Sequence, residues 1–125
     1  MNAIKTTLSA LTLLLAAGTA LAEKAPATAE GGALVGPSGM TLYTFDKDPA
    51  GGGSSACAGD CAKKWPPLTA AAGAKPSGDY SLVKRDDGSH QWAYKGKPLY
   101  YGAKDAKPGD RTGDGVKDVW HVATP

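Results

Sequence analysis

The chain has 125 residues, 14 basic and 12 acidic side chains, a net charge of +2, 17 glycines and 9 prolines. This length suits a single domain, and the scattered charges do not favour nucleic-acid binding. Abundant glycine and proline, with aromatic residues that are mostly Tyr and Trp, are typical of short strands joined by turns and not of a helical bundle.

The N-terminal segment, residues 1–22, has the three parts of a cleavable secretory signal. Lys5 gives a positive start, residues 8–17 form an apolar run, and residues 20–22 have the small-x-small pattern of a cleavage site. The apolar run is well short of the ~20 residues that a membrane-spanning helix needs, and no later run is long enough. We therefore expect export and signal cleavage. Because no Cys lies near the cleavage site, we expect a soluble periplasmic or secreted protein without a lipid anchor.

The first half of the exported part predicts a leader, a hairpin and a helical turn. Residues 23–32 mix Ala, Pro, Thr and Glu in no periodic order, which predicts a disordered leader. Residues 33–35 and 40–45 flank a turn cluster and predict a hairpin. After a glycine-rich loop, residues 57–64 predict a short helical turn. It ends before Pro66, since the residue preceding a proline is pushed out of the α region.

The second half predicts further strands. Residues 80–85 and 90–95 flank an Asp-Gly turn and predict a hairpin. Residues 97–103 predict the next strand. Residues 104–117 form a long polar loop, and residues 119–123 predict the closing strand.

An internal repeat relates the two halves. Residues 39–48 align with residues 96–105, sharing Gly, Leu, Tyr, Lys and Asp at equivalent positions. Each segment is followed by a glycine-rich polar loop and then a Trp, so the copies span about 33–70 and 80–124. An open solenoid needs about three or more copies, and two copies therefore predict one pseudo-symmetric domain over residues 33–125.

These patterns together predict the fold class. We expect an all-β domain of about six or seven short antiparallel strands, built from two related halves and monomeric. One short helix near residues 57–64 fits this fold. The alternative is an α+β fold that contains this helix.

The repeated residues have a consistent structural interpretation. In a strand, a Leu and the Tyr that follows it point to opposite faces. The Tyr ring can be buried while its hydroxyl finds a polar partner. The Asp five residues later can accept backbone N–H bonds and organise the loop. The motif therefore predicts structural roles for Tyr43, Phe45, Asp48 and Trp65 in the first copy, and for Tyr100, Asp105 and Trp120 in the second.

This pattern resembles the Y-x-(F/W/Y)-x-x-D signature of a family of bacterial secreted repeats, many of them predicted lipoproteins. Residues 43–48 fit the signature, and the Cys pair followed by Trp-Pro-Pro-Leu and the Trp-His-Val ending are similar as well. The second copy departs from it at Gly102, where the signature has an aromatic residue, and the lipobox Cys is absent. The resemblance covers nearly all of residues 33–123 and implies an exported repeat of unknown function.

Cys57 and Cys61 are the only cysteines. In an oxidising compartment they favour a disulfide. On one helical turn, residues four apart lie on the same face, so the two sulfurs can meet. The alternative is a redox or metal-binding thiol pair. The spacing is not C-x2-C, and no second Cys/His pair completes a zinc set, so we expect a structural disulfide.

The acidic loop over residues 110–118 partly resembles a Ca²⁺ loop, because oxygen ligands at alternate positions suit a hard cation. His121 stands where such a loop has its bidentate Glu. A hydrogen-bonded Asp/Gly turn loop is the alternative. The candidate Ca²⁺ ligands are Asp110, Thr112, Asp114 and Asp118.

The two histidines, His90 and His121, each follow a strand pattern beside a Trp. With Met40 they could bind copper or nickel, but nothing in the spacing brings them together. No serine lies in a G-x-S-x-G motif. We therefore expect surface or half-buried strand histidines and no enzymatic activity.

Three functional hypotheses follow. The first is a non-enzymatic, exported cell-envelope module that binds an envelope protein or glycan or has a structural role. The second is a periplasmic metal-binding or redox accessory protein that uses Cys57 and Cys61, the histidines or the loop over residues 110–118. The third is an enzyme with a Tyr/Asp pair at a loop mouth. Asp side chains saturated by local N–H groups indicate a structural role, whereas unpaired oxygens in an open pocket indicate a ligand site.

Overall fold

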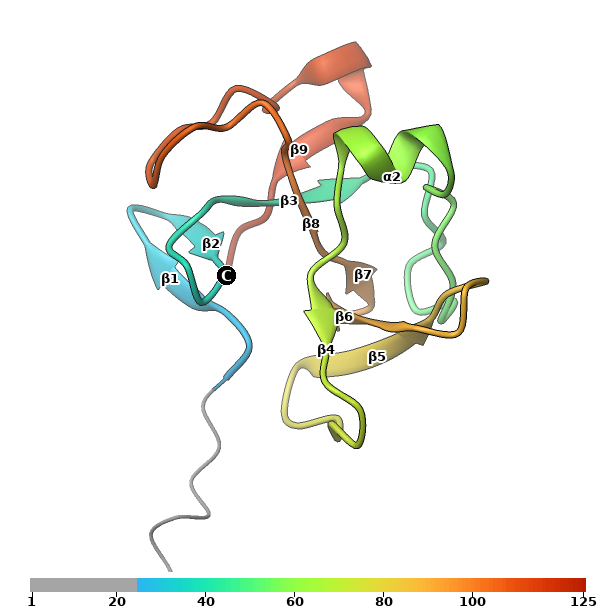
Figure 1. Cartoon of the computed structure of the whole chain (residues 1–125). Helices are drawn as coiled ribbons and strands as arrows, with labels where there is room; N and C mark the ends of the chain where they lie inside the picture. Colours follow the sequence, from blue (N-terminus) through green and yellow to red (C-terminus); the bar gives the residue numbers. More distant parts are fainter. Residues whose placement is uncertain (1–24) are drawn as a thin grey trace, which may run out of the picture.

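The computed structural model describes residues 25–125 and shows short strands in antiparallel sheets with one short α-helix (Figure 1). This confirms the expected all-β class. The signal predicted over residues 1–22 lies outside the described residues and stays a prediction. Within the described part, no helix is long and apolar enough to cross a bilayer. In chain order the elements are β1 (Thr28–Glu30), β2 (Ala33–Val35), β3 (Leu42–Phe45), α2 (Asp60–Lys64), β4 (Thr69–Ala70), β5 (Tyr80–Lys84), β6 (His90–Tyr94), β7 (Lys97–Pro98), β8 (Tyr100–Tyr101), the 3-10 helix η1 (Val116–Asp118) and β9 (Trp120–Val122).

A pseudo-two-fold arrangement surrounds the central strand pair. In the sheet β8-β3-β9, Tyr43 lies opposite Tyr100 in antiparallel register. On its other side, β3 pairs with β9, which carries Trp120. On the far side of β8, the Tyr101 N–H donates to the carbonyl of Pro66, directly after the first-copy Trp, at 2.7 Å. Each Tyr strand therefore lies between the Tyr strand of the other copy and the segment around the Trp of the other copy.

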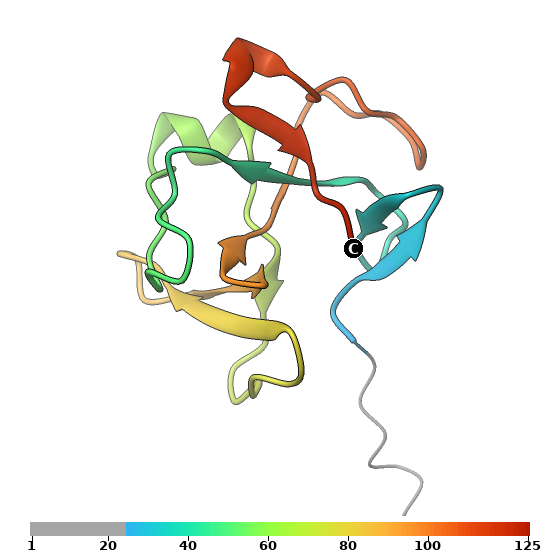
Figure 2. The same ribbon diagram turned by 180° about the vertical axis from the view of Figure 1, so that it is seen from behind.

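A hairpin precedes each Tyr strand. The pair β1-β2 stands before β3, and the sheet β4-β6-β5, with β7 on β6, contains the corresponding hairpin β5-β6 before β8. In Figure 2 the first hairpin lies at the right and the second lower down, and both contribute side chains to one apolar cluster. The two copies thus share the order of hairpin and Tyr strand, and the hairpin strands are longer in the second copy.

A disordered leader is expected over residues 23–32, but within the described part of this range residues 28–30 form β1. Glu30 pairs with Ala33 across Gly31 and Gly32, whose φ values are +60° and +81°. A two-residue turn with positive φ at both positions matches the twist of a hairpin, and glycine adopts it without strain. Low apolar content hid this strand, since it is stabilised by pairing and not by burial of its own side chains.

Two other expected elements are shorter than predicted. The first hairpin is reduced to a bridge between Val35 and Thr41, and β3 begins only at Leu42. The strand expected over residues 97–103 splits into β7, which pairs with β6, and β8, which pairs with β3. At Leu99, between them, the chain passes from one sheet to the other, and this change of partner interrupts the strand.

The core has two apolar clusters, one on each side of the Tyr strands. Leu42 and Leu99 belong to the first cluster, and Tyr43 and Tyr100 belong to the second. All four side chains are fully buried. The alternation expected for Leu-Tyr in a strand is therefore observed in both copies. The second cluster also contains Cys57, Trp65 and Trp120.

Candidate functional site

The two Tyr–Asp pairs of the motif are crossed between the copies. The Tyr43 hydroxyl donates to Asp105 Oδ2 at 2.7 Å, and the Tyr100 hydroxyl donates to Asp48 Oδ2 at 2.6 Å. The crossing follows from the register, because the two tyrosines face each other across β3 and β8. Each motif therefore provides the Tyr of one site and the Asp of the other. In neither copy does the Tyr hydroxyl donate to the Asp of the same copy.

The second oxygen of each Asp serves its own copy. Asp48 Oδ1 accepts the N–H of Ala56 at 2.6 Å, and Asp105 Oδ1 accepts the N–H of Thr112 at 2.9 Å. The Thr112 hydroxyl also donates to Asp105 Oδ1. The expected loop-organising role is thus observed, and both carboxylates are saturated. These contacts indicate structural roles.

Burial sets the protonation of these groups. Burial, and then the hydrogen bond to Asp105, raise the pKa of the Tyr43 phenol. Burial and the bond to Asp48 do the same for the pKa of Tyr100. Burial also raises the pKa of Asp48, against the lowering effect of its bonds from Tyr100 and Ala56. Both phenols therefore remain hydrogen-bond donors at neutral pH.

We name each site by its tyrosine. The Tyr43 site comprises Tyr43, Asp105, Thr112 and Gly113. The Gly113 N–H donates to the Tyr43 hydroxyl at 3.2 Å. Apart from the motif residues, this site is closed by the backbone and one hydroxyl.

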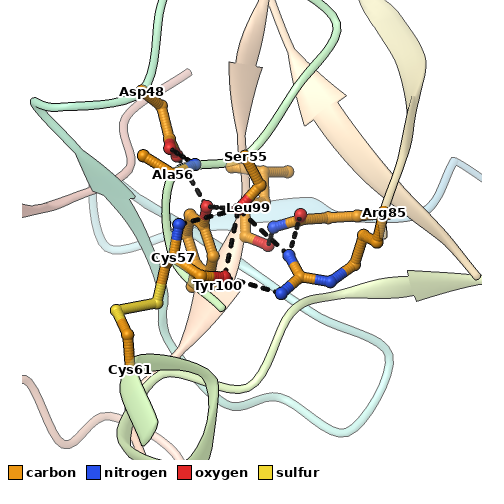
Figure 3. The surroundings of a disulfide bond; sticks show 9 residues. Asp48, Ser55, Ala56, Cys57, Cys61, Arg85, Leu99 and Tyr100 are labelled. Carbon is orange, nitrogen blue, oxygen red and sulfur yellow. Dashed lines mark hydrogen bonds between the residues drawn. A yellow bond between two sulfur atoms is a disulfide. The ribbon is translucent and has the colours of Figure 1, made fainter. Parts of the chain in front are cut away.

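The Tyr100 site comprises Tyr100, Asp48, Ser55 and Arg85, and side chains close it (Figure 3). The Ser55 hydroxyl lies within hydrogen-bond distance of the Tyr100 hydroxyl. Arg85 Nη1 donates to Ser55 Oγ at 3.1 Å, and its Nη2 donates to the carbonyl of Cys57 at 2.6 Å. A guanidinium therefore fixes the loop that carries Ser55.

Gln91 ties this network to the core. Arg85 Nη1 donates to Gln91 Oε1 at 2.7 Å, and Gln91 Nε2 donates to the Leu99 carbonyl at 2.7 Å. Gln91 is fully buried. Sequence reasoning missed Arg85, Ser55 and Gln91, because they come from separate elements and follow no local motif.

The disulfide between Cys57 and Cys61 is confirmed, with the two Cα atoms 5.2 Å apart. Its local geometry differs from the expected single helical turn, because Cys57 precedes α2, which begins at Asp60 after Gly59 with φ +61°. In Figure 3 the bond joins the loop of the Tyr100 site to α2. No free thiol remains among residues 25–125.

Three of the four candidate Ca²⁺ ligands make hydrogen bonds to other groups of the protein. Asp110 accepts the N–H groups of its own turn at 2.9 and 3.2 Å, Asp114 accepts an N–H of β9 at 3.1 Å, and Thr112 donates to Asp105. Asp118 lies in η1 with φ +59°. In the described part of the chain, no three His, Cys, Asp or Glu side chains are grouped to hold a metal. These contacts match the Asp/Gly turn loop given as the alternative.

The histidines lie in different sheets. His90 is exposed in β6, and His121 lies in β9, with Nε2 2.8 Å from Asp46 Oδ2. Met40 lies in the turn before β3. The structure therefore does not assemble the copper or nickel site considered above.

An aromatic stack joins the two copies. We use this name for Phe45, Trp120 and Trp65. The Trp65 and Trp120 rings are parallel, with centroids 3.8 Å apart, and Phe45 stacks on Trp120 at 4.3 Å. Tyr43 meets Trp65 edge-on at 5.4 Å, as Tyr100 meets Trp120 at 5.1 Å. These aromatic side chains thus form one continuous apolar wall.

The stack lacks a ring at Gly102, which takes the position equivalent to Phe45. Gly102 does not have a positive φ, so its backbone does not require glycine. A Cβ there would lie 3.6 Å from Trp65 Cζ3 and 3.1 Å from Tyr43 Cε2. The departure from the signature therefore leaves Trp65 without the ring that Trp120 has in Phe45.

A cleft of about 500 Å³ runs along the aromatic stack. It lies between α2, the segment after β8 and the loop through η1, elements that gather at one end of the molecule in Figures 1 and 2. Phe45, Trp65 and Trp120 line it together with Gly102, and Asp60 is its one acidic lining residue. Five lysines of the described chain also line it: Lys47, Lys63, Lys64, Lys104 and Lys117.

These lysines carry mostly uncompensated charge. Lys63 lies 3.6 Å from Asp60, and both side chains are exposed. Among residues 25–125, the other four cleft lysines make no ion pair within 4.0 Å. Lys117 has φ +52°, a left-handed conformation that a non-glycine residue adopts only at an energetic cost. The cleft is therefore apolar along its wall and cationic around it.

Sequence reasoning missed this cleft, although one signal was present. Lys47 and Lys104 occupy equivalent positions in the repeat, and both line the cleft. The remaining lysines come from α2 and η1 and share no spacing with them. Only the fold brings these segments together.

Comparison with known proteins agrees with the two-copy arrangement. A family model described as a secreted repeat of unknown function matches residues 24–69 and residues 81–124. No curated protein and no solved structure matches the chain. The two matched segments correspond to the two halves of the domain, and the first includes β1.

Proposed function

This chain belongs to the family of secreted repeats of unknown function, and from that premise we propose that it is a non-enzymatic, exported module of the cell envelope that binds a ligand in its cleft. The observation that carries the proposal is the joining of an apolar wall and five lysines in one space of about 500 Å³. Small-molecule sites are commonly concave, largely apolar and equipped with a few polar groups, at ~300–1,000 Å³.

The contacts of the titratable groups support a binding role over catalysis. The Tyr and Asp side chains of both motifs are engaged with each other and with the backbone. The Thr112 hydroxyl beside the cleft donates to Asp105, as does the Thr112 N–H. The ionisable side chains that line the cleft are then the lysines and the exposed Asp60. Among the described residues, these side chains do not form the nucleophile–base arrangement of covalent catalysis.

Tryptophan fluorescence offers a direct test. Trp65 and Trp120 line the cleft, whereas Trp92 lies in β6. Protein purified from the exported fraction of cells producing the full chain is titrated with envelope extracts of those cells. A Trp92→Phe variant removes the remote signal. We expect a saturable change in emission, and a bound molecule that native mass spectrometry recovers with unchanged mass.

A lysine variant provides the control for this test. Replacing Lys47, Lys64 and Lys104 together by Gln should abolish the emission change, because it removes three of the unpaired charges. A matched Lys75→Gln, Lys84→Gln and Lys95→Gln variant, at lysines that do not line the cleft, should leave the change intact. Equal binding to both triple variants, or the absence of a bound molecule, contradicts the proposal. Recovery of a chemically altered molecule contradicts the non-enzymatic part.

A further inference from the structure

We propose that the ligand of the cleft is a planar aromatic anion, whose ring packs against Trp65 at Gly102 and whose negative group is held by the lysines. This inference rests on the proposed function and adds the chemical class of the ligand. It is argued from the asymmetry between the two copies and from the charge around the cleft.

The first argument is the missing fourth ring. Trp120 is stacked between Trp65 and Phe45. The pseudo-two-fold relation predicts a ring beyond Trp65, at the position of Gly102. The structure has a glycine there, and this glycine lines the cleft beside Trp65. A flat apolar ring from a ligand completes the aromatic order that the protein itself provides on the other side.

The second argument concerns Gly113, which also lines the cleft. It follows Thr112, whose N–H contact with Asp105 matches that of Ala56 with Asp48. Gly113 is therefore the counterpart of Cys57, which is fully buried in the Trp120 cluster. A Cβ at Gly113 would lie only 2.6 Å from Trp65 Cη2, so the Trp65 ring packs directly on this glycine, whereas the copy with Trp120 has a side chain at the equivalent position. Trp65 is also more exposed than Trp120, at 9% against 3%, and the side of Trp65 that lacks a ring is the one at Gly102.

The third argument is charge. Five lysines and one aspartate line the cleft, whereas the whole chain is only +2. Lys47 and Lys104 bring a charge from each copy, and η1 brings Lys117 in a strained conformation. Uncompensated cations around an apolar space raise the local concentration of anions. The complementary ligand therefore combines an apolar plane with a carboxylate, sulfonate or phosphate.

Matched probes separate the two parts of this inference. Anilinonaphthalene sulfonate and phenylnaphthylamine share a fluorescent aromatic body, but only the first carries a sulfonate. We expect one molecule of the sulfonate to bind per chain. The affinity of the neutral probe should be lower by at least about tenfold. Naphthoate and decanoate, both carboxylates, then compete for the site. Naphthoate should compete at least about tenfold better, since only it offers a ring to Trp65.

Two variants place the probe in the cleft. Gly102→Phe supplies the missing ring and should reduce sulfonate affinity at least about tenfold. Lys104→Gln should weaken the sulfonate severalfold without changing the neutral probe, and Lys75→Gln should change neither. If Gly102→Phe fails to fold, Lys104→Gln and the naphthoate competition still decide the question.

Several results overturn the inference. Equal affinity for the charged and neutral probes contradicts the preference for an anion. Equal competition by decanoate and naphthoate contradicts the preference for an aromatic ring. Unchanged sulfonate binding in folded Gly102→Phe, or in Lys104→Gln, places the probe elsewhere. A neutral or aliphatic molecule recovered from the envelope extract overturns this inference alone. The absence of any bound molecule overturns the proposed function as well.

Discussion

The Tyr43 site and the Tyr100 site hold equivalent Tyr–Asp pairs, but different groups surround them. At the Tyr100 site, Ser55 and Arg85 close the pair and the disulfide fixes the adjoining loop. At the Tyr43 site, the N–H of a glycine and the hydroxyl of Thr112 take their place. One copy is braced by side chains, whereas the other has glycines, Gly102 and Gly113, beside Trp65. The difference teaches that a repeat can keep its fold-forming contacts in both copies and vary only their surroundings.

The largest expected effect comes from the aromatic stack. Trp120→Ala should lower the free energy of unfolding by about 3–5 kcal/mol, because a buried aromatic ring is replaced by a cavity. Trp65→Ala should cost about 1 kcal/mol less, since Trp65 loses one stacked neighbour and Trp120 loses two. Urea unfolding of both variants measures the difference. An equal or larger loss of stability for Trp65→Ala contradicts the idea that Trp120 is more strongly stacked than Trp65.

Removal of the disulfide should affect one site more than the other. Replacing Cys57 and Cys61 by Ala should cost about 2 kcal/mol, because the closed loop is short. Amide exchange should accelerate at Ala56, which donates to Asp48, while Thr112 should keep its protection. Equal acceleration at both amides means that the bond stabilises the domain as a whole and does not brace the Tyr100 site.

The crossed pairing predicts a specific pattern of coupling. A double-mutant cycle of Tyr43→Phe with Asp105→Asn should give about 1–2 kcal/mol, because the two side chains are in contact. The cycle of Tyr43→Phe with Asp48→Asn, within one copy, should give less than about 0.5 kcal/mol. Chemical unfolding of the single and double variants yields both values. Stronger coupling within the copy shows that the pairs are not crossed.

Lys117→Gly separates stability from binding at the cleft. Glycine adopts φ +52° without strain, so the variant should gain about 0.5–1 kcal/mol in stability. It should also bind anilinonaphthalene sulfonate more weakly, because one cleft charge is lost. Thermal unfolding and probe titration measure the two effects. A stability loss shows that Lys117 makes a favourable contribution that outweighs its backbone strain.

The smallest effect concerns the pH dependence contributed by Asp48. Burial raises the pKa of Asp48 above the ordinary value of 3.8, so the folded state holds this proton more tightly than the unfolded state. The contribution of Asp48 to stability is then largest below pH 3.8 and falls as the pH rises through the raised pKa. The carboxyl NMR titration of Asp48 should have its midpoint above 3.8. That of the exposed Asp87 should lie below it, because bonds from Ser89 lower the pKa of Asp87. A titration midpoint for Asp48 at or below 3.8 contradicts the raised pKa and the pH dependence of stability that follows from it.

Local patterns were sufficient for part of this structure. The opposite burial of Leu42 and Tyr43 follows from the two-residue period of a strand, which needs no knowledge of the fold. The disulfide was predictable because only two cysteines are available in an exported chain. The Asp-Gly hairpin between β5 and β6 also depends on neighbouring residues alone.

Other features depend on contacts between distant segments. The Asp five residues after each Tyr indicated a role in its own loop, and only the facing register of Tyr43 and Tyr100 assigns its other oxygen to the opposite copy. The strand β1 was missed because its partner β2 stabilises it. Gly102 was recognised as a departure from the signature. Its consequence required the position of Trp65, which lies far from Gly102 in the sequence.

The exchange of hydroxyl and carboxylate between the copies has a consequence for assembly. A chain with one motif carries a Tyr without its acceptor and an Asp without its donor. Such a chain completes both sites only when a second molecule supplies the missing halves about the axis between β3 and β8. The segment from β4 to β5 removes this need by making both halves one polypeptide. During synthesis and export, Tyr43 in the N-terminal half therefore has its native hydrogen-bond partner only after Asp105 of the C-terminal half has been made.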